Sequence, residues 1–380
     1  MTPETNRVYE LSFEKWVYGG DALGRWEGQV VLAPYLVPGE TARVEVEREE
    51  KGLLRARPLE ILTPAPQRVP PPCPYFGRCG GCHYQHTGYD YQLEQKQAIL
   101  REMLRRVGKM EPPETIDVIA GEPWGYRNRV HLHVREGRIG YLEAGSHTLC
   151  AIDACPIASP RINQALRESL EGGSLPPRVE SVELFTDDQD VLATSGVSDY
   201  QVGAESYRIS RYSFFQVNRF LTEALVARVV GEQSGEAALD LYAGVGLFSL
   251  PLARRFGSVT AVESGGAAHR DLQFNAQRAG VSVRAERMEA EQFLGSLDRT
   301  PDFVLADPPR AGLGKGVVRH LLRLRAPRVT IVSCDPATLA RDLAPLAGAG
   351  YRIERMTLVD LFPQTFHIET VVDLLRSEEK

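Results

Sequence analysis

Short apolar runs alternate with helix-like stretches through the last third of the chain. From Ala237 onward, five such runs lie at residues 237–242, 258–263, 281–285, 303–307 and 329–333. This βαβ alternation predicts a mostly parallel, doubly wound sheet, and therefore the α/β fold class. Two further runs, at 351–359 and 365–374, are joined by a link too short for a parallel crossover. We therefore expect the last strand to run antiparallel to its neighbours.

The N-terminal part of the chain follows a different pattern. Residues 7 to about 62 alternate apolar and polar positions, with breaks at Gly19-Gly20 and Pro38-Gly39. Short strands joined by turns predict a small closed β-barrel of the oligonucleotide-binding (OB) kind. A proline-rich stretch at 64–72 is too stiff and too poor in donors for a strand or helix, so it marks a boundary.

The segment after the prolines predicts a small α+β middle domain. It contains a cysteine cluster, a helix-like segment at 91–107 and strand-like runs near 130–134 and 182–185. We therefore expect three domains: a barrel at residues 1–63, a middle domain at 64–215, and the doubly wound domain at 216–380.

Charge and hydropathy limit the classes of function. The 44 basic and 50 acidic residues give a net charge of −6, which argues against coating nucleic acid through charge alone. A local basic face is still compatible, because residues 310–341 are rich in arginine. The longest uncharged apolar run, at 30–37, is far shorter than the roughly 20 residues of a spanning helix. The first seven residues do not resemble a secretory signal, so we expect a cytoplasmic protein without a membrane partner.

The ends of the predicted parallel strands indicate a cofactor pocket. The first strand runs into a turn with Gly244 and Gly246, which let the backbone approach a ligand closely. Ser249 replaces the last glycine of a dinucleotide fingerprint, which disfavours NAD and FAD. The second strand ends at Glu263, where a carboxylate can accept hydrogen bonds from the ribose of an adenosine cofactor. The fourth ends at Asp307, whose following two prolines predict a rigid pocket wall.

Cys334 lies where the fifth strand is predicted to meet a helix. Asp335 is a good N-cap and Pro336 a good first helical residue. The helix dipole favours a thiolate at Cys334 and the charge of Asp335 opposes it, so the sequence leaves the net effect open. An antiparallel last strand would bring His367 and Glu369 toward this thiol, and either could be a general base.

Five motifs in this chain, in this order, resemble those of the S-adenosylmethionine-dependent RNA uracil-5 methyltransferases. They are Phe214-Phe-Gln-Val-Asn218, Asp240-Leu-Tyr-Ala-Gly-Val-Gly246, Asp307-Pro-Pro-Arg-Ala-Gly312, Ser333-Cys-Asp-Pro-Ala-Thr-Leu-Ala-Arg-Asp342 and Phe362-Pro-Gln-Thr-Phe-His-Ile-Glu369. The resemblance extends over essentially the whole chain. It implies that the N-terminal barrel is a TRAM domain that binds RNA and that the C-terminal part has the class I methyltransferase fold.

The resemblance also implies roles for individual residues. Cys334 would attack C6 of a uracil ring, which makes C5 nucleophilic enough to take a methyl group, and Glu369 would later remove the C5 proton. The residues around S-adenosylmethionine would be Gln216, Tyr242, Glu263 and Asp307, beside the turn at Gly244. The uridine must be extruded from the RNA to react, and Phe214, Phe215 and the arginines after 310 are candidates for gripping it.

Cys73, Cys79 and Cys82 lie within ten residues. A disulfide is not expected in a cytoplasmic chain of this size, whereas four thiolates suit zinc or an iron–sulfur cluster. The fourth ligand would be Cys155 or Cys150. Relatives with this spacing carry a 4Fe-4S cluster and the Cys155-Pro context resembles their fourth ligand; zinc with His83 or His86 is the alternative.

Two other classes of function compete with an RNA uracil-5 methyltransferase. A non-catalytic RNA-binding iron–sulfur protein would lack the nucleophile or the donor pocket, and an amino-group methyltransferase would need neither Cys334 nor Glu369. Members of the family act on transfer RNA or on large-subunit ribosomal RNA. The barrel together with the cysteine cluster is more typical of the bacterial ribosomal RNA enzymes, so ribosomal RNA is the favoured partner. No feature indicates an obligate protein partner.

Overall fold

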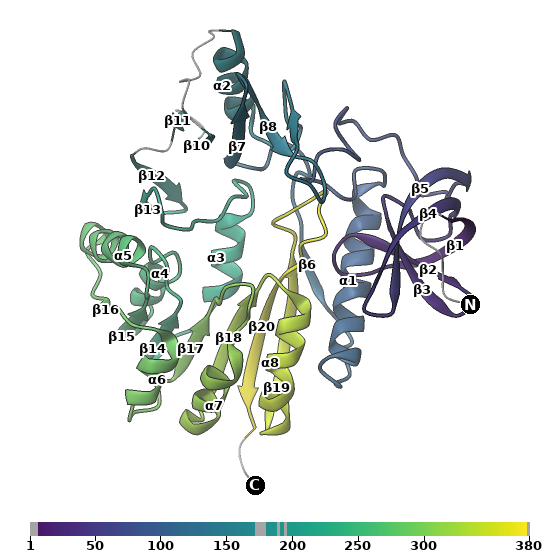
Figure 1. Ribbon diagram of the computed structural model, residues 1–380. Helices are drawn as coiled ribbons and strands as arrows, with labels where there is room; N and C mark the ends of the chain where they lie inside the picture. The colour runs from purple at the N-terminus through teal and green to yellow at the C-terminus, as the bar shows by residue number, and fades with distance from the viewer. Residues whose placement is uncertain (1–6, 172–179, 188–190, 194–195, 378–380) are drawn as a thin grey trace.

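The computed structural model describes residues 7–171, 180–187, 191–193 and 196–377. Residues 1–6, on which the expectation of no secretory signal mainly rests, lie outside the described ranges. The described C-terminal part forms an eight-stranded sheet in the order β16-β15-β14-β17-β18-β20-β19-β6 (Figure 1). Its strands are β14 (Gly235–Leu241), β15 (Phe256–Val262), β16 (Arg284–Glu286), β17 (Phe303–Ala306), β18 (Arg328–Ser333), β19 (Tyr351–Val359), β20 (Glu369–Arg376) and β6 (Asp117–Ile119).

The direction of the strands confirms the sequence-based expectation. Strands β16, β15, β14, β17 and β18 pair in parallel, and β20 pairs antiparallel with both β18 and β19. The predicted hairpin between the last two strands is therefore present. Because β20 alone is reversed among these strands, its N-terminal end lies at the edge of the sheet where β17 and β18 end.

Helices cover both faces of this sheet, which makes it doubly wound as predicted. The helices are α1 (Tyr89–Arg106), α3 (Thr222–Val230), α4 (Ser249–Ala253), α5 (Gly266–Ala279), α6 (Ala290–Ser296), α7 (Gly314–Leu324) and α8 (Pro336–Gly348). Apolar side chains of α6, α7, α8 and α1 share a core with Leu239 and Leu241 of β14. The intervening Ala238 faces the other core, with side chains of α3 and α4. The alternation along one strand thus supplies both cores.

The N-terminal strands close into the predicted barrel, in the order β1-β2-β3-β5-β4. They are β1 (Val8–Trp16), β2 (Asp21–Trp26), β3 (Gln29–Pro34), β4 (Thr41–Glu50) and β5 (Leu53–Thr63). Phe13, Trp16 and Val44 fill its interior. The Trp16 ring also stacks on Tyr84, with ring centres 4.0 Å apart, and so joins the barrel to the segment before α1. In Figure 1 the barrel lies beside α1, away from the C-terminal helices.

The middle region is mixed, as expected. Its described residues form a sheet in the order β11-β10-β7-β8-β9 beside the helix α2 (Pro160–Glu171), followed by the hairpin β12-β13. The strands are β7 (Arg129–Arg135), β8 (Arg138–Leu142), β9 (Leu149–Ala151), β10 (Ser181–Thr186), β11 (Val191–Ala193), β12 (Val197–Val202) and β13 (Glu205–Ser210). Strand β6 leaves this region and pairs in parallel with β19, at the edge of the C-terminal sheet. The middle and C-terminal parts therefore share one sheet.

The last strand begins later than the sequence predicted. The run from Thr365 suggested a strand, but β20 begins at Glu369, and the preceding residues form a loop held by α1. The Lys96 ammonium donates to an Asp360 carboxylate oxygen at 2.6 Å and to the Phe362 carbonyl at 3.0 Å. Lys96 and Asp360 are fully buried, with exposed side-chain fractions of 0% and 1%. These long-range polar contacts hold the start of the loop against α1. Pairing of β20 begins only at Glu369, so the predicted start at Thr365 was wrong.

Candidate active site

The structure brings Cys334 and Glu369 to the same edge of the C-terminal sheet. Ser333, the last residue of β18, pairs with Thr370 of the antiparallel β20. Cys334 and Glu369 each lie one residue beyond this pair, so they face each other across neighbouring strands. Asp307 directly follows β17, the next strand, and its carboxyl acts electrostatically on both groups. Residues far apart in the sequence thus form one polar cluster.

The turn after Cys334 has the expected helix cap. One carboxylate oxygen of Asp335 accepts hydrogen bonds from the backbone N–H groups of Ala337 at 2.9 Å and Thr338 at 2.8 Å. Burial, with the carboxyls of Glu369 and Asp307, raises the pKa of Cys334 to about 12 against the opposing charge of Arg310. The free protein therefore holds a protonated thiol at neutral pH. Burial and carboxyl charge outweigh the helix dipole that favours a thiolate.

The two candidate bases differ in their electrostatic surroundings. Glu369 is 4% exposed, and burial together with the Asp307 charge raises its pKa well above the ordinary range. A carboxylate in this setting has a high affinity for a proton. Burial and the charge of Arg310 instead lower the pKa of His367 to about 3, which makes it a weak base. The environment therefore favours Glu369 over His367 for accepting a proton.

A carboxylate is fixed opposite the glycine turn. Glu263 accepts hydrogen bonds from the backbone N–H groups of Gly244 at 2.9 Å and Gly265 at 2.5 Å. Gly244 has a φ of +56°, and a Cβ there would point into open space. At Gly246, with φ +93°, a Cβ would lie 2.6 Å from the Leu272 side chain. The turn thus packs closely on α5 at one glycine and stays open toward a ligand at the other.

The remaining residues expected around a methyl donor follow β14 and β17 or precede α3. Tyr242 follows β14, is half-buried and has a φ of +62°. Gln216 is 5% exposed and precedes α3. Burial and the charge of Asp240 raise the pKa of Asp307 to about 7. Asp240 is fully buried, and one of its carboxylate oxygens accepts from the Ser249 hydroxyl at 2.5 Å. Buried carboxyl groups therefore lie at the ends of β14 and β17.

Sequence reasoning missed a contribution from the barrel. Tyr18, in the turn between β1 and β2, donates a hydrogen bond from its hydroxyl to the Cys334 carbonyl at 3.3 Å. Its ring also meets the edge of Phe366, with ring centres 5.6 Å apart. The only local signal is an aromatic residue beside Gly19-Gly20, which has no relation to Cys334 in the sequence. The barrel thus contacts the backbone of Cys334.

The candidates for gripping a base separate into core and surface residues. Phe215 is 2% exposed and packs in the core, whereas Phe214 is 67% exposed. Most arginines after 310 are engaged locally: Arg319 with Glu291, Arg323 with backbone carbonyls, Arg328 with Gln233 and Arg341 with Asp342. Arg310 differs, because it lines a cavity with His367. The arginine-rich window is therefore mainly structural.

Four cysteines line the cavity that contains Arg310 and His367. Cys73, Cys79, Cys82 and Cys155 surround this space of about 400 Å³, and each is a free thiol. Cys150 does not line the cavity, although it lies near enough to Cys79 to act on its charge; it is fully buried, and its sulfur accepts a hydrogen bond from Arg78 at 3.3 Å. Among the alternative zinc ligands, His83 lines the cavity; His86 packs against the rings of Trp16 and Phe76.

The described cysteine, histidine and acidic side chains do not converge, even in threes, closely enough to hold a single metal ion. The donor set of four thiols around one cavity nevertheless suits a cluster that extends between its ligands. Among the helices in the described ranges, none is long and apolar enough to cross a membrane.

Comparison with known proteins agrees with this geometry. The family model described as tRNA (uracil-5-)-methyltransferase matches residues 178–377. The chain is 34% identical to a 23S rRNA (uracil(1939)-C(5))-methyltransferase, RlmD, of Pectobacterium atrosepticum, over 93% of this chain and 90% of that protein. It is 31% identical to an uncharacterized RNA methyltransferase of Thermosynechococcus vestitus, over 97% of this chain and 98% of that protein.

A solved structure shows the same architecture. The tRNA (uracil-54, C5)-methyltransferase of Pyrococcus abyssi, in complex with S-adenosyl-L-homocysteine, superposes with a TM-score of 0.77 and 25% identity, over 97% of this chain and all of that one. This likeness confirms the expected fold class. Given the extent of these matches, the chain belongs to the S-adenosylmethionine-dependent RNA (uracil-5-)-methyltransferase family.

Proposed function

We propose that the protein methylates C5 of a uridine in large-subunit ribosomal RNA through a covalent adduct at Cys334, with Glu369 as the base. The observation that carries this proposal is the placement of Cys334 and Glu369 one residue beyond the pair Ser333–Thr370. A sulfur nucleophile and a carboxyl of raised pKa can then act on one uracil ring. Gln216, Tyr242, Gly244, Glu263 and Asp307 would hold the methyl donor beside it.

Each reaction step follows from the chemistry of these groups. S-Adenosylmethionine, when bound, supplies the methyl group as a sulfonium. The Cys334 thiolate adds to C6 of uracil, and the resulting enolate attacks the methyl group through C5 while the donor becomes a neutral thioether. Glu369 then accepts the C5 proton, the C6–S bond breaks, and the thiolate returns. Because the pKa of Cys334 is raised to about 12 in the free protein, the thiolate is rare there, and in the assembled complex Arg310 and the cationic donor would offset the carboxyl charges and favour loss of the thiol proton to solvent.

Two substitutions test the covalent route. We expect Cys334→Ala to abolish both methyl transfer and the denaturant-stable complex with RNA containing 5-fluorouracil. Glu369→Gln blocks proton removal, so an adduct with ordinary RNA should accumulate while turnover is lost. His367→Gln is the matched control and should keep turnover. Methylation by the Cys334→Ala variant would rule out this mechanism.

Ribosomal RNA is the proposed target because the named relatives with high identity act on 23S rRNA. Such a target also places the enzyme in the cytoplasm. The second candidate is transfer RNA, which the family description and the Pyrococcus abyssi enzyme favour. Mass spectrometry of 5-methyluridine in purified 23S rRNA and tRNA, with and without the gene, separates the two. Loss of the modification from tRNA alone would assign the second candidate.

We also infer that Cys73, Cys79, Cys82 and Cys155 hold a 4Fe-4S cluster. Their arrangement around one cavity supports this, as does the engagement of the Cys150 sulfur with Arg78 outside the cavity lining. The cluster would join the loop that carries Cys73, Cys79 and Cys82 to the segment between β9 and α2 that carries Cys155. Iron and acid-labile sulfide analysis after anaerobic reconstitution should show the cluster in the wild type and in Cys150→Ser, and its loss in Cys155→Ser. Stoichiometric zinc without sulfide would contradict this assignment.

We propose a separate role for each of the three expected domains. Residues 1–63 would form a TRAM-like RNA-binding barrel, 64–215 an RNA-recognition domain with the cluster, and 216–380 the methyltransferase domain. The contact of Tyr18 with Cys334 supports a barrel that lies close enough to the reacting uridine to touch the same RNA.

A further inference from the structure

Two exposed aromatic side chains lie between β13 and α3. Tyr212 is 81% exposed and Phe214 67%, more than any other large apolar side chain in the described ranges. Apolar side chains exposed together on a protein surface commonly mark a contact site. The segment that carries them directly precedes Gln216, one of the residues proposed to hold the methyl donor.

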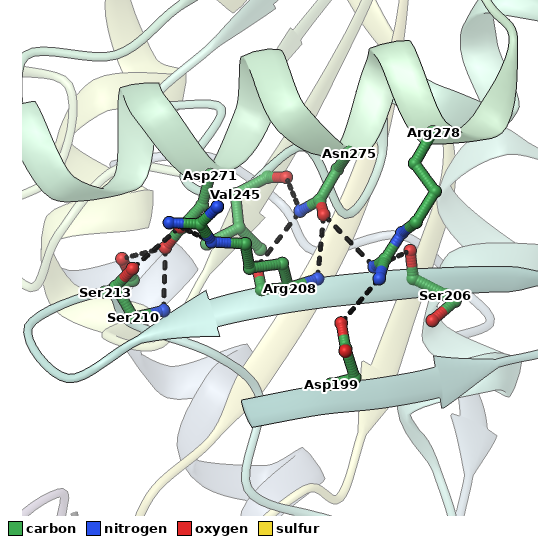
Figure 2. A network of polar contacts seen from close by, with 9 residues as sticks. All are labelled: Asp199, Ser206, Arg208, Ser210, Ser213, Val245, Asp271, Asn275 and Arg278. Carbon is green, nitrogen blue, oxygen red and sulfur yellow. Dashed lines mark hydrogen bonds and ion pairs between the residues drawn. The ribbon is translucent and has the colours of Figure 1, made fainter. Parts of the chain in front are cut away.

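Tyr212 stands at the tip of a tightly held turn. The backbone N–H of Ser213 donates to the Ser210 carbonyl at 2.9 Å and closes the turn. The fully buried Asp271 of α5 accepts hydrogen bonds from the N–H and hydroxyl of Ser210 and from the hydroxyl of Ser213, each at 2.7 Å (Figure 2). Both ends of the turn are therefore fixed to one carboxylate.

The middle region holds the same turn from its other side. Arg129 of β7 donates to the carbonyls of Arg211 and Ser213, each at 2.9 Å, and pairs with Glu183. The Arg211 guanidinium lies 5.2 Å from the centre of the Tyr212 ring. Since the backbone beneath Tyr212 is already ordered, a ligand that stacks on this ring pays little further entropy for ordering it.

The turn borders a groove that adjoins the cavity of the four cysteines, and Arg310, which lines that cavity, acts electrostatically on the Cys334 thiol. Tyr212, Phe214, Arg127 and His131 line a cavity of about 360 Å³. Arg127 and His131 also line the neighbouring cavity, which contains Arg310 and His367. Aromatic faces beside basic side chains complement unstacked bases and the phosphates that join them.

We propose that this groove binds an unpaired RNA base next to the target uridine, by stacking on Tyr212. The proposal rests on the proposed function, because it takes the substrate to be RNA with an extruded uridine. Extrusion leaves the neighbouring bases without their stacking partner. Tyr212, held in place in the groove beside the Arg310 cavity, would replace that partner.

Fluorescence anisotropy of a labelled single-stranded oligouridylate, with S-adenosyl-L-homocysteine present, tests the groove. Tyr212→Ala should weaken binding by about fivefold or more, whereas Tyr212→Phe, which keeps the ring, should not. Phe274→Ala is the matched control. Phe274 of α5 is also exposed, at 39%, and its ring lies under Arg208 of β13 and Arg278 of α5. It lines neither cavity. Because the Tyr212 side chain is on the surface, folding should be unchanged.

Salt dependence separates stacking from charge. Loss of a stacked ring releases no counterions, so the slope of log Kd against log salt should be the same for Tyr212→Ala and the wild type. A shallower slope, or binding by Tyr212→Ala equal to that of Phe274→Ala, would overturn the groove proposal. A wild type that binds the oligouridylate through Tyr212 but methylates no uridine would overturn the proposed function and leave the groove in place.

Discussion

Arg310 opposes the forces that keep Cys334 protonated. Burial and the carboxyls of Glu369 and Asp307 raise the pKa of the thiol to about 12, and the guanidinium of Arg310 lowers it. The same side chain approaches His367, with the two nitrogens 3.5 Å apart. Arg310 thus connects Cys334, the proposed nucleophile, with the cavity lined by the cysteines.

Removing this cation should make Cys334 less reactive. In Arg310→Gln the pKa of the thiol increases, so the thiolate fraction at about pH 8 falls, by roughly tenfold for each unit of increase. We expect slower alkylation of Cys334 by iodoacetamide, measured by mass spectrometry of its peptide. Glu369→Gln removes an opposing carboxyl and should speed the reaction. Arg319→Gln, on the exposed side of α7 beside Glu291, should leave the rate unchanged; faster alkylation in Arg310→Gln would contradict this account.

At the scale of elements, the loop between β19 and β20 sets the position of Glu369, the first residue of β20. The buried pair of Lys96 and Asp360 fastens this loop to α1. Burial lowers the pKa of Lys96, and the Asp360 carboxylate partly offsets that effect. A buried ion pair of this kind contributes mainly because each charge compensates the other where water cannot reach.

Breaking one side of the pair should therefore destabilise the fold. We expect Lys96→Met to cost about 3–5 kcal/mol, seen as a lower urea midpoint. The double variant Lys96→Met/Asp360→Leu should recover much of this loss, because no charge is left buried. Lys15→Met, which breaks the more exposed pair with Glu102, should cost about 1 kcal/mol or less. Equal stability of Lys96→Met and Lys15→Met would show that the buried charge is compensated in another way.

Elements that depend on neighbouring residues could be predicted from the sequence, whereas contacts between distant residues could not. The strands from β14 to β18 could be predicted because each is a short apolar run, and the helix cap at Asp335 because it involves only its next three residues. The loop before Glu369 could not, since Lys96 and Asp360 are 264 positions apart. Tyr18 and Cys334 are 316 positions apart. Neither contact leaves a periodic pattern in the sequence.

At the scale of the whole molecule, the barrel contacts the C-terminal domain at Cys334, the proposed nucleophile. We expect Tyr18→Phe, which loses the hydrogen bond to the Cys334 carbonyl, to lower kcat for methyl transfer by about two- to tenfold. The affinity for RNA should be unchanged, because the substitution leaves the surface of the barrel intact. Tyr9→Phe, in β1 against Trp26, is the control and should change neither quantity. Weaker RNA binding with an unaltered kcat would make Tyr18 a binding residue instead.

Strand β6 belongs to the sheet of another region, and this affects how the chain is made. Its pairing partner β19 is completed more than two hundred residues later. While the nascent polypeptide emerges from the ribosome, β6 has no neighbour on which to pair, and an open strand edge invites association with other chains. Synthesis must therefore approach its end before the middle region can reach its final state, and truncation after α7 should yield a product that aggregates.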